Sequence, residues 1–269
     1  HLPPFSGCAI IATNRCNSHC KMCNRHLHQT KPSEEFEPEL ILKLPHVHFI
    51  NITGGEPFLR NDIEEIIKYA HKRANRVVIS SNGTLDNKII PIMKEYPKTA
   101  LRISIEGIGE TNDYIRGIPN GYEKAMNLLE KLKALGCKDL GISITIHEKN
   151  CKDVLPLYNI CKEKGYDFAT GILHENFFFE NEDNFFWKTN DNSKIVEALE
   201  NLCVEMKKSH NFKDKFRYLF NKELIKKLKD EKISFMPCNC GHQFFVLDPF
   251  GQILACVGSD EKRIMGNLN

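Results

Sequence analysis

The chain has 269 residues, of which 41% are hydrophobic and 27% are charged. This composition supports an ordinary hydrophobic core, and the length fits one large domain or a domain of roughly 200 residues with a small appendage. The 37 basic and 35 acidic residues leave a net charge of only +2, which argues against a nucleic acid or an anionic membrane as partner. The sequence contains no apolar run near the roughly 20 residues of a membrane span and no recognisable signal peptide.

Short segments rich in Ile, Val, Phe and Thr alternate with longer segments of helical periodicity. The short segments predict β-strands, because β-branched and aromatic residues favour extended backbone. The predicted strands are Cys8–Thr13, Val47–Thr53, Arg76–Ser80, Leu101–Ile105, Gly141–Ile146 and Asp167–Ile172. The predicted helices are Asp62–Arg73, Asn87–Tyr96, Tyr122–Leu135, Val154–Lys164, Asn192–Ser209 and Lys213–Asp230.

Glycine and proline mark several ends of these elements. Gly136 and Gly165 follow two predicted helices, where a left-handed cap is expected. Pro156 is expected in the first turn of its helix, where proline is tolerated. The segment His242–Val257 predicts a β-hairpin around the turn sequence Asp-Pro-Phe-Gly at residues 248–251.

Six β–α units in succession predict parallel strands joined by right-handed crossovers. The strands read as continuously apolar, which predicts burial on both faces of the sheet. The expected fold class is therefore α/β, as a partial (β/α)6 TIM-like barrel with a small C-terminal β-hairpin extension that bears cysteines. A doubly wound open sheet is the alternative. In either architecture, functional groups are expected at the carboxyl ends of the strands.

Eleven cysteines are many for a chain of this length, and six of them fall into two tight groups. The odd count argues against a disulfide framework. The first group, Cys16, Cys20 and Cys23, has the spacing Cys-x3-Cys-x2-Cys directly after the first strand. Three thiolates on one loop can hold three irons of a cubane cluster and leave the fourth iron open. A structural zinc site needs four ligands, and zinc with His19 or His26 as the fourth ligand is the alternative.

This loop resembles the signature of the radical S-adenosylmethionine (radical SAM) enzymes, Cys-x3-Cys-x-aromatic-Cys after the first barrel strand. The resemblance implies a [4Fe–4S] cluster whose open iron chelates the amino and carboxylate groups of S-adenosylmethionine. An electron from the cluster then breaks a carbon–sulfur bond, and the 5′-deoxyadenosyl radical abstracts hydrogen from a substrate. Met22 stands where the family usually has an aromatic residue near the adenine. Methionine is apolar and adaptable, so it is expected to keep that contact.

The segment Thr53-Gly54-Gly55-Glu56-Pro57 follows the second strand. Its glycines permit unusual dihedrals and close backbone approach, and the carboxylate of Glu56 can accept hydrogen bonds from an ammonium group. Alone, the segment is an ordinary turn. One β–α unit after the cysteine loop, it resembles the family's motif that binds the cofactor amino group. The resemblance therefore assigns Gly54, Gly55, Glu56 and Pro57 to the cofactor.

The third predicted strand ends in Ser-Ser-Asn-Gly and the fourth in Ser-Ile-Glu-Gly. Turn and helix-cap chemistry is the alternative explanation for both. By resemblance, Ser80 and Ser104 fall where family members bind the cofactor carboxylate or ribose, and Glu106 replaces a more common Asp. Arg116 is expected to pair with the cofactor carboxylate, with an exposed loop arginine as the alternative.

The second cysteine group is Cys238, Cys240 and Cys256. Cys238 and Cys256 fit Cys-x12-Gly-x4-Cys around Gly251, which resembles the opening of the SPASM or twitch extension that carries auxiliary iron–sulfur clusters in a branch of the family. The later cysteines of a full SPASM extension are absent, so the extension is expected to be truncated. One auxiliary [4Fe–4S] cluster on these residues is expected, with zinc binding or disulfide pairing as the alternatives.

These motifs divide the chain into a radical SAM core over residues 1–190, a helical connector over 191–235 and a SPASM- or twitch-like region over 236–269. The enzyme is expected to modify a peptide or protein, and oxidation or rearrangement of a small molecule such as a sugar, an alcohol or a cofactor precursor is the alternative. A reducing partner such as flavodoxin or ferredoxin and a cytoplasmic location are expected. A non-catalytic zinc or iron–sulfur protein is the competing class.

Two further segments have an unusual composition. Residues 174–187 are crowded with aromatic side chains, which predicts a hydrophobic cover for the barrel rim, with the wall of a substrate pocket as the alternative. The lysine-rich residues 207–232 predict a solvated helix face.

Overall fold

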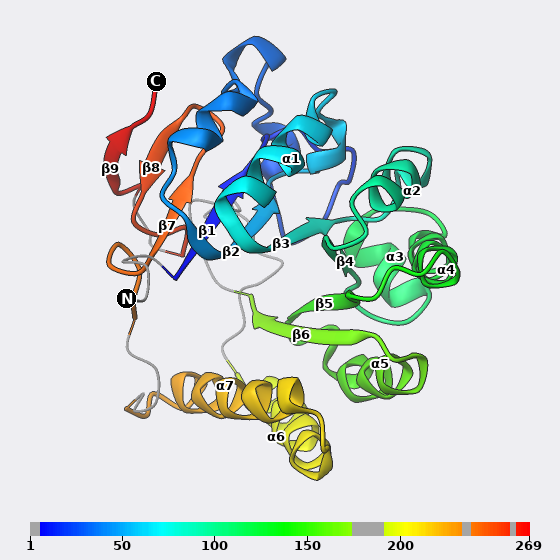
Figure 1. Cartoon of the computed structure of the whole chain (residues 1–269). Coiled ribbons are helices and arrows are strands. Elements are labelled where there is room, and N and C mark those ends of the chain that lie inside the picture. Colours follow the sequence, from blue (N-terminus) through cyan, green and yellow to red (C-terminus); the bar gives the residue numbers. More distant parts are fainter. Residues whose placement is uncertain (1–5, 174–190, 233–237, 259–261) are drawn as a thin grey trace.

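The computed structural model describes residues 6–173, 191–232, 238–258 and 262–269. Within them, nine strands form one sheet in the order β6-β5-β4-β3-β2-β1-β7-β8-β9 (Figure 1). The strands are β1 Gly7–Ile11, β2 Val47–Thr53, β3 Ala74–Ser81, β4 Ala100–Ser104, β5 Leu140–Ile146, β6 Asp167–Ile172, β7 Phe244–Leu247, β8 Gln252–Leu254 and β9 Ile264–Asn267. The α-helices are α1 Ile63–Arg73, α2 Asp86–Glu95, α3 Glu110–Arg116, α4 Gly121–Ala134, α5 Cys151–Lys164, α6 Ser193–Lys208 and α7 Phe212–Leu228.

Strands β1 to β6 are parallel, and each pairs with the next along the chain. The predicted partial (β/α)6 barrel is therefore confirmed, and its sheet stays open instead of closing into a full barrel. The predicted hairpin forms as β7 and β8. It joins the same sheet, because β7 pairs in parallel with β1. Strand β9, which was not predicted, adds at the far edge beside β8.

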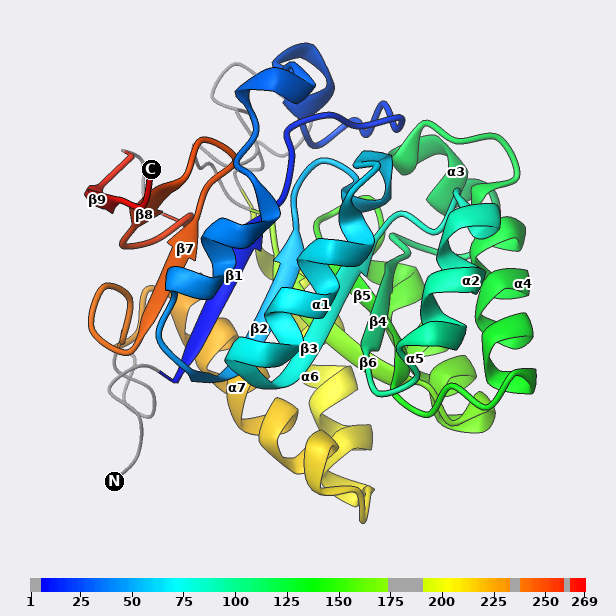
Figure 2. The same cartoon turned by 45° about the horizontal axis from the view of Figure 1, so that its top comes forward.

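One face of the parallel sheet packs against α1, α2, α4 and α5 (Figure 2). Alternate residues of the strands face these helices and are fully buried, and they include Ile10, Ile52, Ile79, Ile103 and Ile142. Helix α6 packs beside α5 and extends the helical layer past β6. Each buried side chain of this size contributes about 1.5–3 kcal/mol, so this face supplies most of the core.

The opposite face of the sheet corrects the expectation of continuously apolar strands. On β2 to β5 its alternate positions include Asn51, Ser80, Arg102, Ser104 and Ser143, and on β1 they are the apolar Ala9 and Ile11. Successive side chains on a strand point to opposite faces. Strands β2 to β5 therefore alternate between a helix-covered apolar face and a largely polar face, where the chemistry of the chain is concentrated, whereas β1 is apolar and buried on both faces as predicted.

Some local expectations hold and others fail. Gly136 and Gly165 do follow α4 and α5 with positive φ angles of 87° and 69°. Pro156 is not in a first turn, because α5 already begins at Cys151. Helix α3 was not predicted, and it places Arg116 at a helix end instead of in an open loop.

Two sequence-based expectations concern other parts of the chain. The aromatic-rich segment 174–187 lies outside the described residues. Across the described ranges, none of the helices combines the length and the apolar character needed to cross a bilayer.

Candidate functional site

The carboxyl ends of β1 to β5 surround a cavity of about 220 Å³. It gathers most of the residues that the motifs nominated, namely Cys16, Cys20, Met22, Cys23, Gly54, Gly55, Ser80, Ser104 and Arg116. Its walls also include Glu106, noted in the sequence as a replacement for Asp, and residues that were assigned no cofactor contact, namely Arg25, Thr53, Ser81, Asn82, Ser143 and Thr145. Most of these lie at a strand end, a position that could have marked them in the sequence.

The two glycines of the Gly-Gly-Glu-Pro segment lie directly against the start of the cysteine loop. The backbone N–H of Gly55 donates to the Thr13 carbonyl at 2.7 Å, and that of Glu56 donates to the Arg15 carbonyl at 2.8 Å. A Cβ atom on Gly54 would lie 2.4 Å from the Thr13 oxygen, and one on Gly55 would lie 2.2 Å from the Arg15 oxygen. Glycine is therefore required here by close backbone approach.

The carboxylate of Glu56 finds its partners within the chain, outside the cavity wall. Its carboxylate is fully buried and accepts hydrogen bonds from Phe58 N at 3.2 Å, Ser81 Oγ at 2.9 Å and Asn82 N at 2.7 Å. Burial raises its pKa, although these hydrogen bonds oppose the rise. Neither Glu56 nor Pro57 lines the cavity. The carboxylate instead ties this segment to the end of β3, and the two glycines present the segment's backbone to the cavity.

Helix α3 holds the other side of the cysteine loop. Lys21 N donates to the Ile115 carbonyl at 2.8 Å. Gly117, which ends the helix with φ 64°, lies so close that a Cβ atom would be 2.6 Å from the His19 oxygen. These contacts place Arg116 beside the three cysteines. The loop is therefore held between the glycine segment after β2 and the end of α3.

Arg116 is a buried cation with limited pairing. Its Nη1 lies 3.6 Å from Glu106 Oε1, its side chain is 11% exposed, and its Nε has no hydrogen-bond partner among the described residues. Burial raises the pKa of Glu106 to about 7, although the charge of Arg116 and the N–H of Thr145 oppose the rise. The alternative of an exposed loop arginine is therefore wrong. A buried guanidinium of this kind is suited to a ligand carboxylate.

The three thiols of the first group influence one another electrostatically, and Cys20 is buried whereas Cys16 and Cys23 are partly buried. Burial raises the pKa of Cys16 and Cys23, and that of Cys20 to about 12. Such thiols lose their protons when a metal binds, since the thiolate is the ligand. Neither His19 nor His26 lines the cavity. In the described parts of the chain, no group of three His, Cys, Asp or Glu residues is arranged for a single metal ion. The donor set fits a three-cysteine iron–sulfur cluster better than tetrahedral zinc.

The second cysteine group lies at the other end of β1. Cys238 and Cys240 precede β7 and Cys256 follows β8, so the hairpin brings them to the amino end of the strand that pairs with β1. Burial and the neighbouring Cys256 and Cys238 thiols raise the pKa of Cys240 to about 12. The three sulfurs are thus adjacent, but Cys238 and Cys240 are exposed, in contrast to the first group.

Comparison with known proteins gives a consistent result. The family model described as the Radical SAM superfamily matches residues 10–172. The Fe-coproporphyrin III synthase of Methanosarcina barkeri is 32% identical over 159 residues, which cover 56% of this chain and 40% of that protein. The sporulation killing factor maturation protein SkfB of Bacillus subtilis is 27% identical over 164 residues, 59% of this chain and 40% of that protein. The matched segments thus span about two fifths of these relatives.

A solved structure shows the same fold. Native anSMEcpe with bound AdoMet and the Cp18Cys peptide matches with a TM-score of 0.69 and 21% sequence identity. The match covers 99% of this chain and 78% of that one. The likeness therefore includes both the six parallel strands and the hairpin beside β1.

Proposed function

Because the chain belongs to the radical SAM superfamily, we propose that it cleaves S-adenosylmethionine reductively in the cavity at the carboxyl ends of its strands. Enzymes of this superfamily use a [4Fe–4S] cluster and S-adenosylmethionine. The observation that carries the proposal is the convergence in one cavity of three cysteines, two cavity-facing glycines and a buried arginine.

Each lining residue has a proposed role. Cys16, Cys20 and Cys23 hold the cluster, which supplies one electron when bound. Arg116 binds the cofactor carboxylate, because it is a buried cation with one long ion pair. The backbone of Gly54 and Gly55 contacts the ammonium group of the cofactor, and the side chain of Met22 packs near the adenine. The hydroxyls of Ser80 and Ser104 bind the ribose or the carboxylate.

Anaerobic reconstitution tests the proposal. The protein is loaded with iron and sulfide and incubated with S-adenosylmethionine and dithionite, and 5′-deoxyadenosine is measured. Cys16→Ala is expected to abolish the product, whereas Cys151→Ala, which removes a thiol outside the cavity, is expected to retain it. A chain that binds only zinc and shows no cubane absorption would contradict the proposal, as would normal product from the Cys16 variant.

The proposed substrate is a peptide or protein. This choice is supported by the maturation protein SkfB among the relatives and by the peptide bound in the anSMEcpe structure. A cofactor precursor of the tetrapyrrole class is the second candidate, because the 32% identical relative is an Fe-coproporphyrin III synthase. The two are separated by measuring which class, peptides or tetrapyrroles, stimulates 5′-deoxyadenosine formation. Stimulation by tetrapyrroles alone would reject the first choice.

Residues 236–269 are proposed to carry one auxiliary cluster on Cys238, Cys240 and Cys256, with residues 191–235 as the connector and residues 1–190 as the core. The adjacency of these thiols supports the proposal. Replacing all three with Ala is expected to lower iron from about eight to about four per chain, since each cubane holds four irons. Unchanged iron content would reject the auxiliary cluster. Flavodoxin or ferredoxin is the proposed electron donor.

A further inference from the structure

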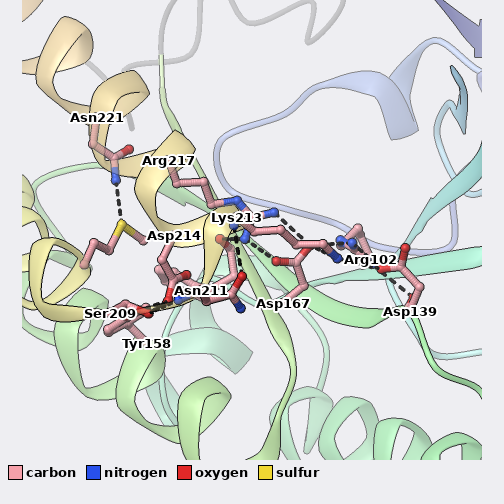
Figure 3. Close-up of polar contacts among 12 residues, drawn as sticks. Arg102, Asp139, Tyr158, Asp167, Ser209, Asn211, Lys213, Asp214, Arg217 and Asn221 are labelled. Carbon is pink, nitrogen blue, oxygen red and sulfur yellow. Dashed lines mark hydrogen bonds and ion pairs between the residues drawn. The ribbon is translucent and has the colours of Figure 1, made fainter. Parts of the chain in front are cut away.

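The amino ends of the parallel strands carry a network of charged side chains (Figure 3). Arg102 on β4 donates from Nη2 to Asp139 Oδ1 at 2.6 Å and also pairs with Asp167, the first residue of β6. Arg217 on α7 donates from Nη2 to Asp167 Oδ2 at 2.8 Å. The cofactor cavity lies at the carboxyl ends of the same strands, so this network occupies the opposite end of the sheet.

The network contains more positive than negative charge. Among the described residues, Asp139 and Asp167 pair with four cations, Arg76, Arg102, Lys213 and Arg217, so four positive charges less two negative charges leave an excess of two. The nearby Asp214 accepts instead from Tyr158 and Ser209. Asp214 forms no ion pair with these four cations among the described residues, and counting its negative charge as well still leaves a local excess of one positive charge.

Lys213 is the least well paired of these cations. Its Nζ lies 3.6 Å from Asp139 and 3.7 Å from Asp167, which is beyond hydrogen-bonding distance. It is also the second residue of α7, where the helix dipole is positive and disfavours a cation. A positive charge in this place is stabilised by an anion that approaches from the open side of the network.

A cavity of about 240 Å³ provides that approach. Its charged wall consists of the four cations and Asp167, and its apolar wall consists of Val78, Phe212 and Phe216. Phe212 is 81% exposed and Phe216 is 52% exposed, so both rings are accessible to a ligand at this cavity. The volume is below the roughly 300–1,000 Å³ of drug-sized pockets, so only a small molecule fits.

We propose that this cavity binds a small anion, a phosphate or carboxylate joined to an apolar or aromatic group, with Lys213 contacting the anion and Phe212 and Phe216 covering the apolar part. The charge excess accounts for the anionic group, and the two exposed rings account for the apolar group. Arg102 and Arg217, held by the carboxylates, contribute a fixed positive field.

Calorimetric titration tests this site with phenyl phosphate and benzoate as the two anionic probes, which distinguish the phosphate from the carboxylate source. Inorganic phosphate lacks the ring, and phenol lacks the charge at neutral pH. The folded chain is expected to bind at least one of the two anionic probes more tightly than inorganic phosphate and phenol. Absence of saturable binding of both probes at millimolar concentrations and low salt would overturn the proposal.

A matched pair of variants locates the binding. Lys213→Met is expected to lower the affinity for the probe that binds by about tenfold, as the loss of one charge-assisted hydrogen bond does. Lys215→Met removes the same charge from an exposed position of the same helix that does not line the cavity, and it is expected to leave the affinity unchanged. Equal affinities in the two variants would overturn the proposal. Since no cofactor or turnover is involved, failure here leaves the proposed cleavage of S-adenosylmethionine untouched.

Discussion

The two ends of the parallel sheet each hold a buried arginine, and the two arginines differ in their partners. At the amino end, Arg102 donates to Asp139 and pairs with Asp167, and it also donates to backbone carbonyls. At the carboxyl end, Arg116 has one ion pair of 3.6 Å with Glu106 and an unpartnered Nε among the described residues. The arginine whose groups are paired within the chain belongs to the fold, whereas the arginine with a single long ion pair keeps donors available to a ligand.

The cysteine groups differ in the same way. The first lies at the carboxyl end of β1 with Cys20 buried and the other two partly buried, and the second lies largely exposed at the opposite end. The contrast suggests four experiments that separate stability from ligand binding.

The largest effect on stability is expected from Asp167→Asn. This change leaves Arg102 and Arg217 with one carboxylate fewer in a buried site, and breaking such a pair costs about 3–5 kcal/mol. Chemical denaturation measures the loss, and Asp86→Asn, which removes an exposed pair with Lys131, should have little effect. A small effect of the Asp167 variant would remove the structural role assigned to the amino end.

At the carboxyl end, Arg116→Met is expected to act on binding instead. The affinity for S-adenosylmethionine should fall by about 10- to 100-fold, the range for losing hydrogen bonds to a charged group. The unfolding free energy should fall less than in the Asp167 variant, because the ion pair lost, with Glu106, is long at 3.6 Å. Binding to the reconstituted protein is measured, with Arg76→Met as the control at the amino end. If Arg116→Met lost stability but kept its affinity for S-adenosylmethionine, Arg116 would belong to the fold and not to the binding site.

Gly55→Ala tests the backbone contact that holds the cysteine loop. The added Cβ atom would lie 2.2 Å from the Arg15 oxygen, and overpacking of this kind costs about 1–3 kcal/mol. The amount of iron that the protein retains after reconstitution should fall together with this loss of stability. Gly266→Ala, where a Cβ atom meets nothing within 4 Å, is the matched control. Equal iron content in both variants would show that the close approach is dispensable.

The smallest effect is expected for the pH dependence of the stability that Asp139 contributes at the amino end of the sheet. Although burial opposes it, the charge of Arg102 and the hydrogen bonds from Arg76 and Arg102 hold the pKa of Asp139 well below its usual range. A lowered folded-state pKa contributes stability above the unfolded-state value of about 3.8, and that stability is lost as the pH falls below it. Asp139→Asn should therefore destabilise by about 1 kcal/mol at neutral pH, a modest value because the carboxylate is partly exposed, and the difference should shrink on acidification. A difference that grows in acid would contradict the assignment.

The local patterns of the sequence were sufficient for several parts of this protein. Val47–Thr53 and Asp167–Ile172 form strands with the expected bounds, and the order of β–α units predicted the partial barrel. The cysteine loop and the two glycines were nominated from contiguous residues, because their chemistry depends on spacing within a few positions. The strands and the order of units follow from local backbone preference and side-chain periodicity, whereas the cysteine loop and the glycines were assigned through their resemblance to radical SAM motifs.

Tertiary structure alone decided the rest. It placed Arg116 beside the thiols through α3, turned Glu56 toward the end of β3, and joined the hairpin to β1 with its cysteines at the far end. It also brought Arg102 and Arg217 to the same carboxylate, although they are far apart in the sequence. Such contacts depend on strand order and register, which pair residues that no local window contains.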